Sequence, residues 1–218
     1  MMKVPPPTAA LAGVPAGLQA QGVWSGRRQL FVRFAAEAET ATMYTAAALR
    51  QEVGRLASRA PFHSVAIAGR DALANVDFLK AMFDDGGLPL PTMLDIDGQR
   101  SDEVKHVAKH LALLQVTLDG VLTEPTIERA LASIRSGAEH GVAHALVLCA
   151  DERTSDGQLL RIVEQAHGIS AATSIVIHPS TQQPIDRDRR WITLMERATA
   201  VHGDVRLALR LPAPIGLR

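Results

Sequence analysis

Short apolar runs alternate with helix-forming segments along most of the chain, and this alternation limits the possible folds more than any other feature. Each run is rich in Val, Ile or Leu and does not alternate with polar residues. Runs of this kind are typical of strands that are buried on both faces. The predicted strands are Gln29–Phe34, Ser64–Ala68, Pro91–Leu94, Leu113–Leu118, Ala143–Cys149, Ser174–His178 and Val205–Leu209.

A segment with helical periodicity follows each of these strands except the last. Tyr44 falls on the apolar stripe of the first predicted helix, and Ser101 is the predicted N-cap of the third. Several of the segments end at glycine, as helices commonly do. The predicted helices are Ala41–Ala60, Asn75–Asp85, Ser101–Leu111, Thr123–His140, Asp156–His167 and Asp186–His202.

Repeated βα units predict parallel strands joined by right-handed crossovers. About six such units are too few for the closed eight-unit barrel. We therefore expect an α/β fold built as a partial, open βα barrel with a parallel sheet, and the alternative is a doubly wound open sheet. In both architectures ligands bind at the carboxyl ends of the strands.

Composition supports one folded domain over residues 18–218, preceded by a Pro/Ala-rich N-terminal segment over residues 1–17. The chain has 218 residues, of which 47% are hydrophobic. The N-terminal prolines interrupt any apolar signal region, and no apolar stretch reaches the length of a membrane span, so we expect a cytoplasmic protein. Lys+Arg and Asp+Glu both number 23, which argues against nucleic-acid or membrane partners.

Four sequence fragments occur in the order and spacing seen in one known family. They are LQAQGVWSGRRQLFVRF at 18–34, AGRDAL at 68–73, LDIDG at 94–98 and DVRLALRLPAPIGLR at 204–218. Together they resemble the 7-carboxy-7-deazaguanine synthases of the radical S-adenosylmethionine superfamily. The resemblance spans residues 18–218 and implies a radical-SAM-like partial barrel that forms homodimers.

The resemblance also implies roles for individual residues. Radical chemistry in that superfamily needs three cysteine thiolates on an iron–sulfur cluster, and this chain has one cysteine, Cys149. The cluster is therefore not expected, whereas S-adenosylmethionine and a divalent cation stay open as cofactors. The matched positions are Gln19, Gln21 and Arg27 for substrate binding; Gly69, Asp71, Asp95 and Asp97 for the cosubstrate pocket; and Glu37, Ala41 and Tyr44 for the degenerate cluster loop.

Acidic residues and one histidine directly follow the predicted strands. Parallel strands would bring them to one rim, where they could hold a divalent metal or act as a general acid and base. Asp71, Asp95 and Asp97 are the preferred metal ligands because they lie in the matched fragments. Their alternative role is that of ordinary loop and capping residues. The rim residues are Glu37, Glu39, Asp71, Asp95, Asp97, Asp119, Asp151 and His178.

Three functions follow from these observations. The first is a pseudoenzyme that resembles the synthases and keeps a small-molecule or protein-partner role. The second is an enzyme with a re-purposed acidic site at the rim, working by a metal ion or by acid–base chemistry. The third is an active radical carbon–nitrogen lyase of deazapurine biosynthesis. Cys149 ends an apolar run and is predicted to be a buried, unreactive hydrophobic residue.

Overall fold

In the computed structural model, residues 5–37, 39–69, 71–84, 86–151, 153–179 and 189–211 are described. Within them the chain forms one ten-stranded sheet with helices packed against it. The strands are β1 (Thr8–Gly13), β2 (Ala16–Leu18), β3 (Arg28–Phe34), β4 (Thr42–Thr45), β5 (Ser64–Gly69), β6 (Thr92–Ile96), β7 (Leu113–Leu118), β8 (His144–Ala150), β9 (Ser174–Pro179) and β10 (Val205–Leu207).

The helices lie between the strands in the predicted order. The α-helices are α1 (Ala46–Ala57), α2 (Val76–Asp84), α3 (Val104–Val107), α4 (Glu124–Glu139), α5 (Asp156–Ile169) and α6 (Arg189–Val201). Short 3₁₀ turns are η1 (Ala72–Asn75), η2 (Ser101–Glu103) and η3 (Ala108–His110). None of the helices in the described residues is both long and apolar enough to cross a membrane.

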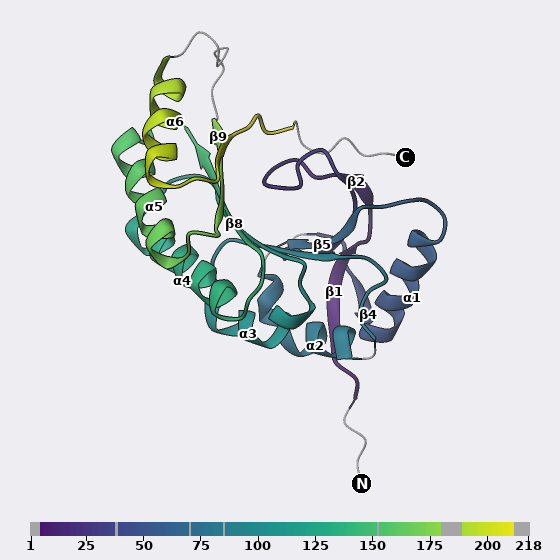
Figure 1. The fold of residues 1–218 in the computed structure, drawn as a ribbon. Coiled ribbons are helices and arrows are strands. Elements are labelled where there is room, and N and C mark those ends of the chain that lie inside the picture. The colour runs from purple at the N-terminus through teal and green to yellow at the C-terminus, as the bar shows by residue number, and fades with distance from the viewer. Residues whose placement is uncertain are drawn as a thin grey trace.

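The strand order follows the chain order across most of the sheet. From β3 through β5, β6, β7, β8 and β9 to β10, each strand pairs in parallel with the next. A doubly wound sheet requires a reversal of strand order, and the parallel strands from β3 to β10 show none. The α/β class and the mostly parallel sheet are thus confirmed. Figure 1 shows a curved sheet with the helices along its outer side, so the architecture is barrel-like and open.

The two faces of the sheet have separate cores because successive strand residues point to opposite sides. The outer face and all the helices share one large apolar cluster, to which Leu94, Leu114 and Leu146 belong. The inner, concave face carries two small clusters that contain no helical residue. Right-handed crossovers without a reversal place every helix on the same side, which leaves the concave face to other parts of the chain.

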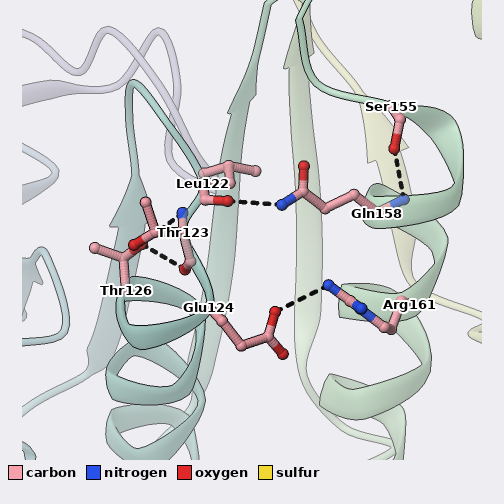
Figure 2. Close-up of polar contacts among 7 residues, drawn as sticks. All are labelled: Leu122, Thr123, Glu124, Thr126, Ser155, Gln158 and Arg161. Atoms are coloured by element: carbon pink, nitrogen blue, oxygen red, sulfur yellow. Dashed lines mark hydrogen bonds and ion pairs between the residues drawn. The ribbon is translucent and has the colours of Figure 1, made fainter.

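Hydrogen bonds and an ion pair connect the N-terminal ends of helices α4 and α5 at the carboxyl edge of the sheet (Figure 2). Ser155 caps α5 by accepting the backbone N–H of Gln158 at 3.2 Å, and the Gln158 side chain donates to the carbonyl of Leu122 at 2.6 Å. One turn further along, Arg161 pairs with Glu124 at 2.9 Å. These contacts hold the helix starts in register beside the strand ends.

The N-terminal part of the sheet differs from the prediction. β1 and β2 pair antiparallel with β3, and β4 pairs antiparallel with β1, so strands occur where none was expected. The predicted helix over Ala41–Ala60 is wrong in its first turn. Tyr44 lies on β4, opposite Ala9, and Thr45 caps α1 by accepting the N–H of Ala48 at 3.2 Å. The β-branched and aromatic residues of this turn favour a strand once a partner edge is present.

The predicted helix over Ser101–Leu111 is also broken in the structure. It consists of η2, α3 and η3, and the residue before η2 is Arg100 with a left-handed φ of 56°. Ser101 lies inside η2 and not at an N-cap, so that prediction is wrong. Short 3₁₀ turns of this kind are common as connectors between strands.

Candidate functional site

Polar side chains gather at the carboxyl end of the concave face. Toward the amino ends of the strands this face is apolar, with Ala66, Met93, Leu113 and Ala145 in one buried cluster. Further along the same strands, on the same face, polar residues replace the apolar ones. They are Asp95 on β6, Gln115 and Thr117 on β7, Cys149 on β8 and His178 on β9. Strand register brings them side by side, for example Asp95 opposite Gln115 and Cys149 opposite His178.

Asp95 is at the centre of this polar group. Its carboxylate accepts the Thr117 hydroxyl at 2.8 Å and the Gln115 amide at 2.9 Å, and the Gln19 side chain is a further hydrogen-bonding neighbour. Burial raises the pKa of Asp95 to about 6, because the desolvation of the carboxylate outweighs these hydrogen bonds and the attraction of Arg210. A carboxyl group with this pKa exchanges its proton near neutral pH.

A loop after β2, Gln19–Gly26, lies over the polar end of the concave face, and we call it the cover loop. It can be followed in Figure 1 as the dark segment inside the curve of the sheet. Val23 and Trp24 pack on the apolar clusters below, and the Gln21 amide donates to Thr117 at 3.4 Å. The N–H of Gly26 donates to the carbonyl of Gln19 at 2.8 Å, which closes the loop on itself.

His178 joins the cover loop to the C-terminal part of the sheet. Its Nε2 accepts the backbone N–H of Gly22 at 2.9 Å, so its Nδ1 carries the proton and donates to the carbonyl of Ala208 at 2.8 Å. Burial lowers the pKa of His178, the hydrogen bond to Ala208 opposes this shift, and the positive charge of Arg210 adds to it. The neutral imidazole therefore holds both segments in place.

A small pocket opens beside Asp95, between the ends of β5 and β6. Its lining residues are Gly69, Asp71, Ala72, Leu73, Asp95, Ile96, Asp97 and Gln99. Gly69 has a φ of 109°, and a Cβ there would lie 2.6 Å from the carbonyl oxygen of Phe34, so no other residue fits. The pocket is acidic because three of its lining residues are aspartates.

Backbone strain lies next to this pocket. Among the described residues, the non-glycine positions with positive φ are Asp71 at 49° and Arg100 at 56°. The two residues bind each other, since Nε of Arg100 donates to the two carboxylate oxygens of Asp71 at 2.9 and 2.8 Å. Left-handed backbone at such residues costs about 1–3 kcal/mol each and is concentrated at ligand-binding sites.

The structure brings together most of the residues singled out in the sequence. Gly69, Asp71, Asp95 and Asp97 line the same pocket. Gln19 and Gln21, from a distant fragment, reach the Asp95 and Thr117 side chains at its edge. Arg27 is exposed, and its backbone carbonyl accepts the N–H of Gln19 at 2.9 Å. Of the predicted cluster-loop positions, Glu37 and Ala41 are exposed and Tyr44 packs against the outer core.

The predicted metal site is not assembled. Within the described residues, no group of three or more His, Cys, Asp or Glu side chains could hold a metal ion. Asp71 is bound to Arg100, and Asp97 accepts the backbone N–H and the side-chain amide of Gln99 at 3.1 and 2.9 Å. The three carboxylates are thus turned to separate partners on the protein.

Gln115 and Thr117 were not among the site residues predicted from the sequence. Both lie in the run LLQVTL, where two polar residues stand two positions apart in an otherwise apolar strand. That spacing places both side chains on the same face of the strand. This pattern could have identified them as candidate site residues. Cys149 is 5% exposed, and burial raises the pKa of its thiol to about 11. The interpretation of this residue as buried and unreactive thus agrees with its surroundings.

Comparisons with known proteins identify no family for this chain. No family model matches it, and no curated protein is similar to it. Among solved structures, it is similar to 3-keto-D-glucoside 4-epimerase from E. coli in its apo form, at 13% sequence identity and a TM-score of 0.29. That match covers 73% of this chain and 86% of the epimerase.

The predicted membership in the radical S-adenosylmethionine superfamily is therefore wrong. No family model matches the chain, that of this superfamily included. The four sequence fragments that carried the resemblance have 17, 6, 5 and 15 residues. The same βα turn requirements can produce such fragments in unrelated chains.

Proposed function

We propose that this protein binds a small polar molecule at the carboxyl end of its open barrel, in the pocket between β5 and β6 with Asp95 as the recognition group. The observation that carries the proposal is that Asp95, Asp71 and Asp97 all line one pocket at the strand ends. In βα folds this edge is where ligands bind. The strained pair Asp71–Arg100 beside the pocket supports the same assignment.

The chemistry of the pocket indicates the class of ligand. Its lining carries carboxylates and the Gln99 amide, and Arg100 is the neighbouring cation. Carboxylates accept hydrogen bonds and attract positive charge. The pocket therefore suits a ligand that presents N–H or O–H donors, such as a small amine, amidine or amide, more than an anion.

The pKa of Asp95 favours a second candidate function, a proton-transfer enzyme. A carboxyl group that titrates near pH 6 can take and return a proton under physiological conditions, as a general base or acid must. Thr117, Gln115 and Gln19 would hold its orientation while it does so. In this reading the same pocket holds a substrate whose acidic C–H or N–H lies next to Asp95.

The experiment is a fragment screen by ¹H–¹⁵N NMR with small amines, amidines, amides and matched carboxylates. We expect donor-bearing fragments to shift the amides of residues 69, 71–73 and 95–99 and to raise the melting temperature with concentration. Asp95→Asn should abolish these shifts, whereas Asp77→Asn, at a side chain that is 87% exposed, should keep them. Fragments that bind Asp95→Asn equally well, or an absence of binding in this region, would contradict the proposal.

The enzymatic candidate has its own readout. Each bound fragment is incubated with the protein in D₂O, and exchange of its carbon-bound hydrogens is followed by NMR. Exchange catalysed by the unsubstituted protein and lost in Asp95→Asn would show proton transfer at this site. Binding without exchange would leave a binding protein and eliminate this second candidate.

A further inference from the structure

The cover loop hides an acceptor that has no partner. Gln115 is fully buried and donates to Asp95 through Nε2, but its Oε1 has no hydrogen-bond partner among the described residues. The residue above it is Gly22, where a Cβ would lie 1.8 Å from that oxygen. A buried carbonyl without a donor is destabilising, and a ligand with an N–H group in place of Gly22 would satisfy it.

Two attachments hold the cover loop over this oxygen from the C-terminal side. Gly22 donates to Nε2 of His178, and the N–H of Leu211 donates to the carbonyl of Ala20 at 2.9 Å. His178 also contacts the segment that makes the second attachment, because its Nδ1–H binds Ala208 three residues before Leu211. One imidazole thus binds both the cover loop and the C-terminal segment to which the loop is attached.

The hydrogen bond from Gly22 requires His178 to be neutral. A protonated imidazole has donors on both nitrogens, so Nε2–H would face the N–H of Gly22 and the bond would be lost. The ionisable groups that face His178 are Cys149 on β8 and Arg210 after β10. Two carboxylates lie further away: Asp119 forms an ion pair with Arg210 at 2.8 Å, and Asp95 lies further along the face. Within this group no carboxylate is placed to form an ion pair with the imidazolium.

We propose that the cover loop is a displaceable lid, closed by neutral His178 and released when His178 is protonated, which opens Asp95 and the Gln115 carbonyl to ligand. The lid regulates the site assigned above, so its biological meaning rests on the proposed function. The movement of the lid is independent of the proposed function, because its opening is measured without any ligand. Opening of the lid also narrows the class of ligand, because the surface beneath it presents the acceptor oxygen of Gln115 in addition to Asp95. A ligand with more than one N–H donor would bind both.

The test is hydrogen–deuterium exchange by mass spectrometry between pH 7.5 and 4.5, with rates corrected for the intrinsic effect of pH. The range extends to pH 4.5 because burial lowers the pKa of His178 from its usual value. We expect exchange in peptides covering residues 19–27 to rise about tenfold at the lower pH, the equivalent of one lost hydrogen bond. Peptides covering β7 and β8 should stay protected and serve as an internal reference. The rise should vanish in His178→Gln, because glutamine can accept from Gly22 and does not titrate.

A matched control separates His178 from the other histidine near the loop. The ring of His63 lies 4.8 Å from that of Trp24, edge to face, so its charge could also affect the loop. His63→Gln should therefore retain the pH response. An unchanged response in His178→Gln, or constant protection of residues 19–27 in the unsubstituted protein, would overturn the lid. Asp95 also titrates in this range and binds Gln19 of the loop, so Asp95→Asn should likewise retain the pH response. If His178→Gln does not fold, loss of the response in Asp95→Asn or His63→Gln would overturn the lid.

Discussion

The outer and inner faces of the same sheet are built on different principles. The outer face is covered by helices and buries aliphatic side chains throughout, from Leu30 on β3 to Ile177 on β9. The inner face changes along the strands from apolar to polar, and its cover is a loop and not a helix. The outer face thus provides the stability of the fold. On the inner face, the burial of the polar side chains of Asp95, Gln115 and His178 lowers stability, which is typical of a functional site.

The largest expected effect is on the outer face. Leu114 is fully buried and lies against α4, where a Cβ on Gly137 would come within 2.8 Å of its side chain. Leu114→Ala should therefore lower the free energy of unfolding by about 3–5 kcal/mol through lost burial and a cavity. Denaturant unfolding measures this, with Val121→Ala, at a residue that is 74% exposed, as the control. Equal effects of the two changes would contradict the role assigned to this face.

An intermediate effect is expected for Asp95, and it depends on pH. Because the folded pKa is raised above the unfolded value, the folded state binds the proton more tightly, and stability falls as pH rises from about 4 to 6. Going from pH 7 down to 4.5, the unsubstituted protein should gain about 2 kcal/mol from this group, and Asp95→Asn should lack that gain.

The Asp95 comparison is made by denaturant unfolding at the two pH values. Asp77→Asn is the control, because Asp77 is an exposed carboxylate on α2. Other groups titrate in both proteins, so the difference between the two curves isolates Asp95. Parallel curves for Asp95→Asn and the unsubstituted protein would show that Asp95 is not desolvated and would remove the main reason to consider acid–base chemistry.

The smallest effect concerns the contact between the cover loop and the sheet. Gly22 and Gly26 both have a φ of 78°, but a Cβ at Gly22 meets Gln115 whereas one at Gly26 meets nothing within 4 Å. Both changes to Ala carry the same backbone penalty, so Gly22→Ala should cost about 1 kcal/mol more through the steric contact alone. It should also raise hydrogen exchange in residues 19–27, and Gly26→Ala should not. Identical behaviour would mean that the loop does not press on Gln115.

The parallel part of the fold was predictable because it depends on local patterns. Predicted strands such as Leu113–Leu118 and Ser174–His178 agree with β7 and β9 to within a residue, since runs of buried aliphatic residues are unambiguous at this length. The antiparallel strands β1, β2 and β4 were missed. β2 and β4 have only three and four residues, and residues such as Ala9 and Tyr44 adopt extended structure because a partner edge lies beside them.

The candidate site was predictable only in outline. Because parallel strands end at the same edge, the sequence alone places Asp71, Asp95 and Asp97 near one another, and they do line one pocket. The partners of these aspartates could not be predicted. Arg100 binds Asp71 through a left-handed turn, and the resulting geometry separates the carboxylates that the sequence suggested as metal ligands.

The amino-acid sequence by itself determined the order of βα units, the parallel sheet and the edge at which polar residues collect. All of these follow from periodicity and from the handedness of crossovers, which act over short stretches of chain. Only the tertiary structure decided that a loop from the N-terminal region covers the concave face, that His178 binds Gly22, and that Asp95 is desolvated. These features depend on contacts between residues far apart in the chain, and no local pattern specifies which of them will meet.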